Sequence, residues 1–184
     1  MSKTFRLAIL ECDTPIDSVR ELYGTYGNMF SNLLIPQVTE SFPSSDLALE
    51  ISEWDVVNAR EYPSLEDIDG ILITGSSKST TLLLLAAHVS DPKTEHDSFR
   101  NTPWVLKLVR YAQKVFEAKK AIIGICFGHQ ILARAMGAAV GRSDKGWEVS
   151  ADNIDLTEAG QSLFGKSSLV RTPFFFVPPD EHTC

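Results

Sequence analysis

The sequence predicts buried strands together with helices, and three apolar runs carry that prediction. The first lies in residues 121–137, where small and β-branched residues lead into Gly124-Ile125-Cys126-Phe127-Gly128 and a helical pattern follows at once. This succession indicates a buried strand, a tight turn and a helix. The second and third runs, residues 6–12 and 71–74, predict two more buried strands. The run at 6–12 is apolar enough for a strand in the middle of a sheet.

Length and composition indicate one domain with a sizeable core. The chain has 184 residues and a net charge of −7, which argues against a nucleic-acid or anionic membrane surface. Its three cysteines, Cys12, Cys126 and Cys184, do not suggest a disulfide framework and fit a reducing compartment. No apolar signal core follows the N-terminus, and the longest apolar run, 82–87, is too short to span a bilayer. The expected location is the cytoplasm.

The remaining elements follow from periodicity and from start signals. Helical spacing predicts short helices over 16–23 and 28–34, and the apolar residues of the second are expected in the core. Residues 47–52, continued by 54–57, predict a strand. Thr102 and Pro103 are a good N-cap and first residue for a helix with apolar residues at helical spacing through Phe116.

Cys126 is the candidate nucleophile. A residue at a sharp strand-to-helix corner needs small neighbours, and Gly124 and Gly128 supply that room. The amides from Phe127 onward point the same way, and the start of the helix adds positive potential. A thiol there is expected to have a lowered pKa and to act as a nucleophile. The alternative is a buried structural cysteine, which is the interpretation we give Cys12.

The run from Gly124 to Gln130, Gly-Ile-Cys-Phe-Gly-His-Gln, resembles the nucleophile motif of class I glutamine amidotransferases. More narrowly, it resembles the stand-alone fungal and plant members, some of which act as γ-glutamyl peptidases. The resemblance runs from Arg6 to about Gly165. It implies a flavodoxin-like, three-layer α/β domain over 6–184, a Cys-His-Glu triad and attack on a γ-glutamyl carbonyl.

A second candidate feature is the small-residue turn that follows the strand at 71–74. Such a turn can aim amides at a developing oxyanion, although by itself it is most often only a turn. A later segment around Trp147 is similar to the Gly-Trp-Glu segment that borders the substrate site in the family, and a packed tryptophan in a strand is the equal alternative. The resemblance thus implies these oxyanion and substrate-binding residues: Gly75, Ser76, Ser77, Phe127, Gln130 and Trp147.

The sequence departs from the family pattern in three places. Residues 79–95 are extra relative to family members and are expected to be a translated retained intron or a recent insertion, in a loop beside the site. The tail 168–184 is atypical, so the domain is expected to be truncated at its C-terminal end. The expected His-x-Glu of the triad is missing. His182 stands beside Glu181 in the reversed order, and family members do not use a histidine at the place of His129 as the base.

Two functions of different class follow. The first is an amidohydrolase of glutamine amidotransferase type that acts on glutamine or a γ-glutamyl small molecule through a thioester on Cys126. Hydrolysis is expected unless a synthetase partner supplies the acceptor site for ammonia, and small-molecule biosynthesis is one expected setting. The second is a pseudoenzyme that keeps the fold and the thiol without the base. A redox-sensing or chaperone-like relative on the same fold is a weaker third. No metal or cofactor motif is present in the sequence, and no nucleic-acid or membrane partner is expected.

Overall fold

The computed structural model describes residues 3–43, 47–76, 97–141 and 152–171. The contacts within the chain divide it into two compact units, Met1–Ala139 and Val140–Cys184. The described part of the chain contains no helix both long and apolar enough to cross a membrane.

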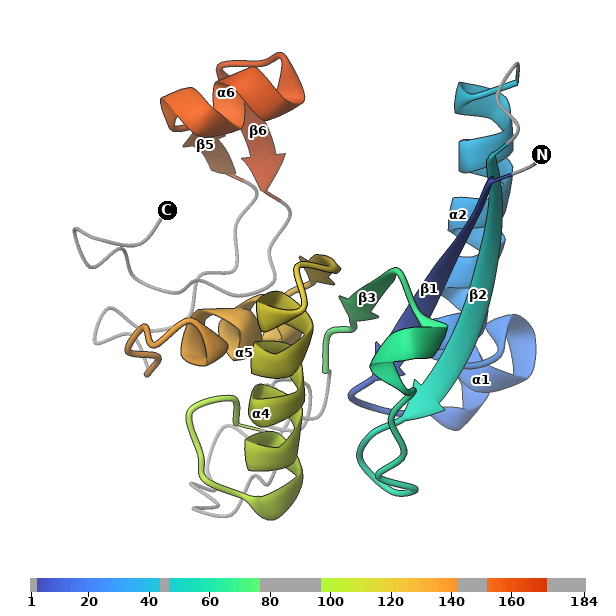
Figure 1. The fold of residues 1–184 in the computed structure, drawn as a ribbon, viewed down its shortest axis with the longest axis vertical. Coiled ribbons are helices and arrows are strands. Elements are labelled where there is room, and N and C mark those ends of the chain that lie inside the picture. The colour runs from blue at the N-terminus through green and yellow to red at the C-terminus, as the bar shows by residue number, and fades with distance from the viewer. Residues whose placement is uncertain (1–2, 44–46, 77–96, 142–151, 172–184) are drawn as a thin grey trace. The chain divides into compact units, whose positions relative to one another are not determined.

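The first unit is built on a parallel sheet, as the prediction of an α/β fold requires. Its strand order is β2-β1-β3-β4, and every neighbouring pair is parallel. The strand predicted to be central is β1, which has β2 on one side and β3 on the other (Figure 1). The four strands are β1 (Lys3–Glu11), β2 (Leu47–Asp55), β3 (Gly70–Ile73) and β4 (Ala121–Gly124).

Alternating side chains of the sheet pack into two separate cores. Ala8 and Leu10 point into the larger one, whereas Leu7 and Ile9 point into the smaller one. Because successive side chains of a strand face opposite sides, the sheet has a covered face on each side. Helices α4 (Pro103–Glu117) and α5 (Phe127–Ala135) supply the larger core, and Phe30 and Leu34 of α2 (Tyr26–Ser41) pack on the smaller. The result is the expected three-layer arrangement.

The helices of this unit follow the predicted positions with one large difference. Helix α2 begins earlier than the predicted 28–34, at a capping box in which Thr25 and Asn28 each accept from the other's backbone, and it continues through Pro36. Leu33, expected in the core, is 57% exposed, because it lies on the solvent side of this longer helix. The helices are α1 (Asp17–Tyr23), α2 (Tyr26–Ser41), the 3₁₀ turn η1 (Leu65–Asp67), α4 (Pro103–Glu117) and α5 (Phe127–Ala135).

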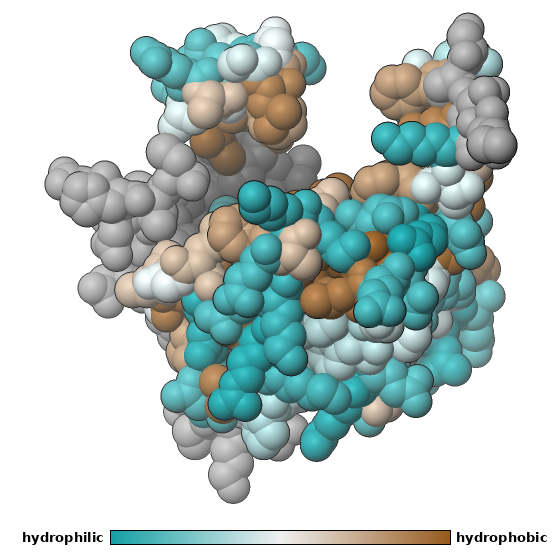
Figure 2. All heavy atoms as spheres, viewed as in Figure 1, coloured by the Kyte–Doolittle hydropathy of each residue, from teal (hydrophilic) through white to brown (hydrophobic). Residues whose placement is uncertain are grey.

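Helix α4 shows the strongest division into two faces. It begins at Thr102 and Pro103 as predicted, and its predicted apolar stripe is buried, except that Phe116 is 57% exposed. The opposite side carries Lys107, Arg110 and other polar residues, and Figure 2 shows a hydrophilic surface over this helix. The apolar face therefore fixes α4 against the sheet.

The expectation that 121–125 forms a buried strand is only half right. In β4, Ile122 packs against the larger core, but Ile123 is 49% exposed and Ile125 is 37% exposed. Within the described residues, β4 has a neighbouring strand only on the β3 side. Ile123 and Ile125 lie on the face of β4 opposite to Ile122, so the described residues cover one face of this strand, and the continuous apolar run gave no sign of which face that would be.

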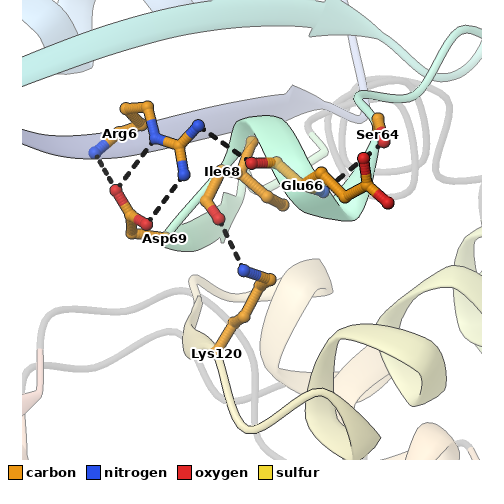
Figure 3. A network of polar contacts seen from close by, with 6 residues as sticks. All are labelled: Arg6, Ser64, Glu66, Ile68, Asp69 and Lys120. Atoms are coloured by element: carbon orange, nitrogen blue, oxygen red, sulfur yellow. Dashed lines mark hydrogen bonds and ion pairs between the residues drawn. The ribbon is translucent and has the colours of Figure 1, made fainter.

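Polar contacts join β1, β3 and β4 near the amino ends of the two shorter strands (Figure 3). Arg6 donates from its backbone N, Nε and Nη2 to the Asp69 carboxylate at 2.9–3.1 Å. Lys120 Nζ donates to the carbonyl of Ile68 at 2.8 Å. These contacts fix the amino ends of β3 and β4, whereas Cys126 lies beyond the carboxyl end of β4.

The second unit is a small hairpin with one helix. Strands β5 (Asp152–Asp155) and β6 (Ser168–Arg171) pair antiparallel, and α6 (Glu158–Phe164) connects them. Thr157 caps α6 by accepting from the amide of Gly160, and Gly165 ends it with a φ of 63°. Of the predicted atypical tail 168–184, β6 is described and residues from 172 lie outside the described ranges.

Candidate active site

Cys126 occupies a strand-to-helix corner, as the sequence predicts. It lies between β4 and α5 with φ 56° and ψ −107°, in a region that non-glycine residues rarely adopt. A backbone conformation of this kind costs of the order of 1–3 kcal/mol and persists where the surrounding structure determines it. The corner therefore presents the thiol at the carboxyl edge of the sheet.

The two glycines of the motif are required by close backbone approach. A Cβ on Gly128 would lie 2.3 Å from the carbonyl oxygen of Ile73 in β3. A Cβ on Gly124 would lie 2.7 Å from the backbone of Gly128. Since no real Cβ comes so close, only glycine at both places lets α5 pack directly against β3 and β4.

Phe127 anchors the corner in the core. Its side chain is 2% exposed and stacks on Trp104 of α4, with 5.5 Å between ring centroids and 23° between planes. Ile131, one turn further along α5, is completely buried. These contacts hold the first turn of α5, and with it the amide of Phe127, in a fixed position beside the thiol.

The turn after β3 lies against Cys126. A Cβ built on Gly75 would be 3.6 Å from the Cys126 Cβ and 3.8 Å from its Sγ. Ser76 is 3% exposed, and its backbone amide donates to the Cys126 sulfur, as does the amide of Phe127. The structure thus brings together four residues of the predicted site: Gly75, Ser76, Cys126 and Phe127.

The expected lowering of the Cys126 pKa is wrong in its net direction. Burial raises the pKa of this thiol to about 12, and the hydrogen bonds from the amides of Phe127 and Ser76 act against that rise. The predicted donors are therefore present, but desolvation of the thiolate outweighs them in this structure. Cys12 is completely buried, its Sγ donates to the carbonyl of Leu10 at 3.6 Å, and burial raises its pKa as well, so the prediction of a structural cysteine is confirmed.

Gln130, predicted to bind substrate, makes a contact inside the protein. Its Oε1 accepts from the hydroxyl of buried Ser98 at 2.6 Å. Arg134, one turn later on α5, donates to the backbone carbonyls of Ser98 and Arg100. In this structure these two α5 side chains hold the segment that leads into α4.

Several predicted features lie outside the described residues. Ser77, Trp147, the extra segment 79–95 and His182 are all in the undescribed ranges. The one histidine within the described ranges is His129, exposed on α5. Across those same ranges no group of three or more histidine, cysteine or acidic side chains could hold a metal ion.

Sequence reasoning missed two residues that connect the end of β1 to the turn after β3: Thr74, which follows β3, and Asp13, which follows β1. Thr74 Oγ1 accepts from the amide of Cys12 at 2.9 Å and donates to the carbonyl of Gly75 at 3.0 Å. Asp13 is 5% exposed, and its Oδ2 accepts from the Ser76 hydroxyl at 3.3 Å. The signal that could have found Asp13 is its position: it closely follows the carboxyl end of a central strand, and functional groups of parallel sheets gather at the carboxyl ends of the strands.

Comparisons with known proteins agree on one family. The family model described as glutamine amidotransferase class-I matches residues 37–172. A glutamine amidotransferase-like protein of Schizosaccharomyces pombe is 34% identical over 88% of this chain and 60% of its own length. Gamma-glutamyl peptidase 3 of Arabidopsis thaliana is 29% identical over 93% of this chain and 57% of its own length. The chain therefore spans a little over half the length of these relatives.

A solved structure gives the same fold. The crystal structure of a glutamine amido transferase from Methylobacillus flagellatus superposes with a TM-score of 0.57 and 16% identity. The superposition covers 97% of this chain and 59% of the Methylobacillus chain. At this identity the likeness concerns the fold alone, and it agrees with the parallel α/β sheet.

Proposed function

The chain belongs to the class I glutamine amidotransferase family, and from that premise we propose that it is a cysteine amidohydrolase of glutamine or a γ-glutamyl compound, with Cys126 as the nucleophile. The relatives named gamma-glutamyl peptidase support this substrate class. The observation that carries the role of Cys126 is its corner: an amide from α5 and an amide from the turn after β3 both point at its sulfur.

The reaction follows from these groups. The sulfur of Cys126 attacks the γ-carbonyl carbon of the substrate, and the proton that the thiol loses is the one that the leaving nitrogen gains. The carbonyl oxygen takes up negative charge in the tetrahedral intermediate, and preorganised amides stabilise such charge. The C–N bond then breaks, the leaving nitrogen takes a proton, and a γ-glutamyl thioester remains. Water attacks the thioester, releases the γ-carboxylate and returns the thiol.

The two amides at the sulfur, from Ser76 and Phe127, are the oxyanion donors in this proposal. Small residues at Gly75 and Gly128 keep the backbone close enough for both donors to serve one acceptor. Each such donor is worth roughly 10²–10³ in rate in acyl-transfer enzymes. The backbone of Ser77 is proposed to belong to the same oxyanion hole, and Gln130 and Trp147 are proposed to contact the bound substrate. Small-molecule biosynthesis is the proposed setting, with a synthetase as partner only where ammonia is transferred rather than released.

A pseudoenzyme is the second candidate, and one observation favours it. Burial raises the pKa of Cys126, which disfavours the thiolate that would act as the nucleophile. His129, the sole histidine of the described ranges, is exposed, and the family resemblance does not make it the base. A protein that keeps this corner without a base would bind γ-glutamyl compounds and release nothing.

Turnover distinguishes the two candidates. The full chain is incubated with glutamine, glutathione and other γ-glutamyl peptides, and released ammonia, amine and glutamate are measured. If the protein is an enzyme, the native protein releases these products and Cys126→Ala does not. Cys12→Ala is the matched control and should keep the activity. Release that survives in Cys126→Ala refutes the role of Cys126, and binding without release by the native protein supports the pseudoenzyme.

A further inference from the structure

Asp13 contacts the candidate oxyanion hole from a separate part of the fold. It follows the end of β1, whereas Ser76 follows the end of β3, and the two residues are 63 positions apart. Both are nearly inaccessible, at 5% and 3% exposed. A buried carboxyl group is costly unless its oxygens are hydrogen-bonded, so its presence here needs an explanation.

The contacts of Asp13 account for both carboxyl oxygens. Oδ1 accepts from the amide of Thr14 at 2.7 Å, which fixes the side chain against its own loop. Oδ2 accepts from the Ser76 hydroxyl at 3.3 Å. The Ser76 amide in turn donates to the Cys126 sulfur. One chain of contacts therefore leads from the end of β1 to the thiol.

We propose that Asp13 is a positioning residue that holds the turn at Ser76 so that its amide stays aimed at Cys126. This inference rests on the proposed function and assigns a role to a residue that does not itself touch the sulfur. The turn needs such support, because Gly75 beside it has no side chain to pack and glycine has the greatest backbone freedom.

A second contact from the end of β1 supports the same turn at Thr74, two residues before Ser76. Thr74, fully buried, accepts from the Cys12 amide and donates to the Gly75 carbonyl. Thr74 fixes the start of the turn and Asp13 fixes its far side. Two adjacent residues at the end of β1 thus hold both sides of Gly75.

The test compares two substitutions that both remove the ionisable group. Asp13→Asn keeps an oxygen for the Thr14 amide and an amide group that can donate to the Ser76 hydroxyl. Asp13→Ala keeps neither. The readout is the rate at which iodoacetamide alkylates Cys126 in the full chain, followed by peptide mass spectrometry, with the buried Cys12 as internal reference. Below the thiol pKa this rate follows the thiolate fraction, which the Ser76 amide increases.

We expect Asp13→Asn to react within about 2-fold of the native protein and Asp13→Ala to react about 10-fold more slowly, the loss of one hydrogen bond to a charged group. Ser76→Ala keeps the amide and loses the hydroxyl, so it should slow alkylation by a similar factor, and the double variant should be no slower than either single one. Asp69→Asn, before the amino end of β3, is the matched control for general destabilisation and should leave the alkylation rate of Cys126 unchanged.

Two results would overturn the assignment: equal rates in Asp13→Ala and Asp13→Asn, or single effects that multiply in the double variant. If Asp13→Ala does not fold, the comparison of Ser76→Ala with Asp13→Asn/Ser76→Ala still decides, because the proposal predicts equal rates for these two. Alkylation needs no turnover, so it separates this inference from the proposed function. Where turnover is found, Asp13→Ala should lower kcat with little change in KM.

Discussion

The substitution Gly128→Ala tests whether the corner depends on direct contact between α5 and β3. The added Cβ would lie 2.3 Å from the Ile73 carbonyl oxygen and 2.9 Å from its carbon, and both are backbone atoms that cannot rotate away. To bring the nearest contact out to 3.0 Å, the helix or the strand must shift by about 0.7 Å. Phe127 and Ile131, fully packed on the same helix, would move with it. Forced overpacking of this kind costs about 1–3 kcal/mol and occasionally more, so we expect about 3 kcal/mol.

Two other glycines supply matched controls. Gly137 has nothing within 4 Å of a built Cβ but has a φ of +86°, so Gly137→Ala should cost about 1 kcal/mol from strain alone. Gly141 has neither a close neighbour nor a positive φ, and Gly141→Ala should be neutral. Urea unfolding followed by tryptophan fluorescence and circular dichroism gives the free energies of unfolding, with the slope m checked for constancy. A Gly128→Ala protein as stable as Gly141→Ala would refute the close packing of α5 on β3.

Three further predictions concern the remaining parts of the first unit. The Arg6 guanidinium lowers the pKa of Asp69 to about 2. A carboxyl group whose pKa is lowered by folding stabilises the folded protein at pH values above its pKa in the unfolded chain, and this stabilisation is lost as the pH falls to the folded-state pKa. The difference in free energy of unfolding between the native protein and Asp69→Asn, measured by urea unfolding, should therefore be constant above about pH 5 and shrink as the pH falls from 4 to 2. A difference that grows on acidification contradicts the ion pair. Ile131→Ala should lose about 2–5 kcal/mol by opening a cavity in the larger core, and a loss under 1 kcal/mol measured by the same method would show that Ile131 is not packed as described. Pro36→Ala should stabilise α2 by restoring a backbone donor within an exposed stretch, seen as a higher melting temperature, and a lower one would show that the helix breaks there.

The elements of the candidate site that could be predicted from the sequence are those encoded over a few residues. The corner needed only the apolar run, Cys126 and two glycines, and each glycine proves to meet backbone at under 3.0 Å. The turn after β3 was similarly visible as a small-residue stretch. Which predicted residues touch substrate stays a prediction, and Ser77 and Trp147 lie outside the described ranges.

What the sequence could not show depends on contacts between distant segments. Asp13 reaches Ser76 across 63 positions, and no local pattern relates them. The raised pKa of Cys126 comes from burial by surrounding elements, whereas the local motif contains only the groups that lower it. The exposure of Ile123 depends on the neighbours of β4, which an apolar run does not reveal. In α2, Pro36 is a local stop signal that the helix passes through.

The central claim is that Cys126 becomes acylated by a γ-glutamyl group. The most direct measurement is rapid acid quenching of the full chain with a γ-glutamyl substrate, followed by intact-protein and peptide mass spectrometry. The account predicts an adduct with the mass of a glutamyl group on the Cys126 peptide, none on the Cys12 peptide, and none in Cys126→Ala. Substrate turnover with no adduct on Cys126 at any quench time, or an adduct that persists in Cys126→Ala, would contradict it.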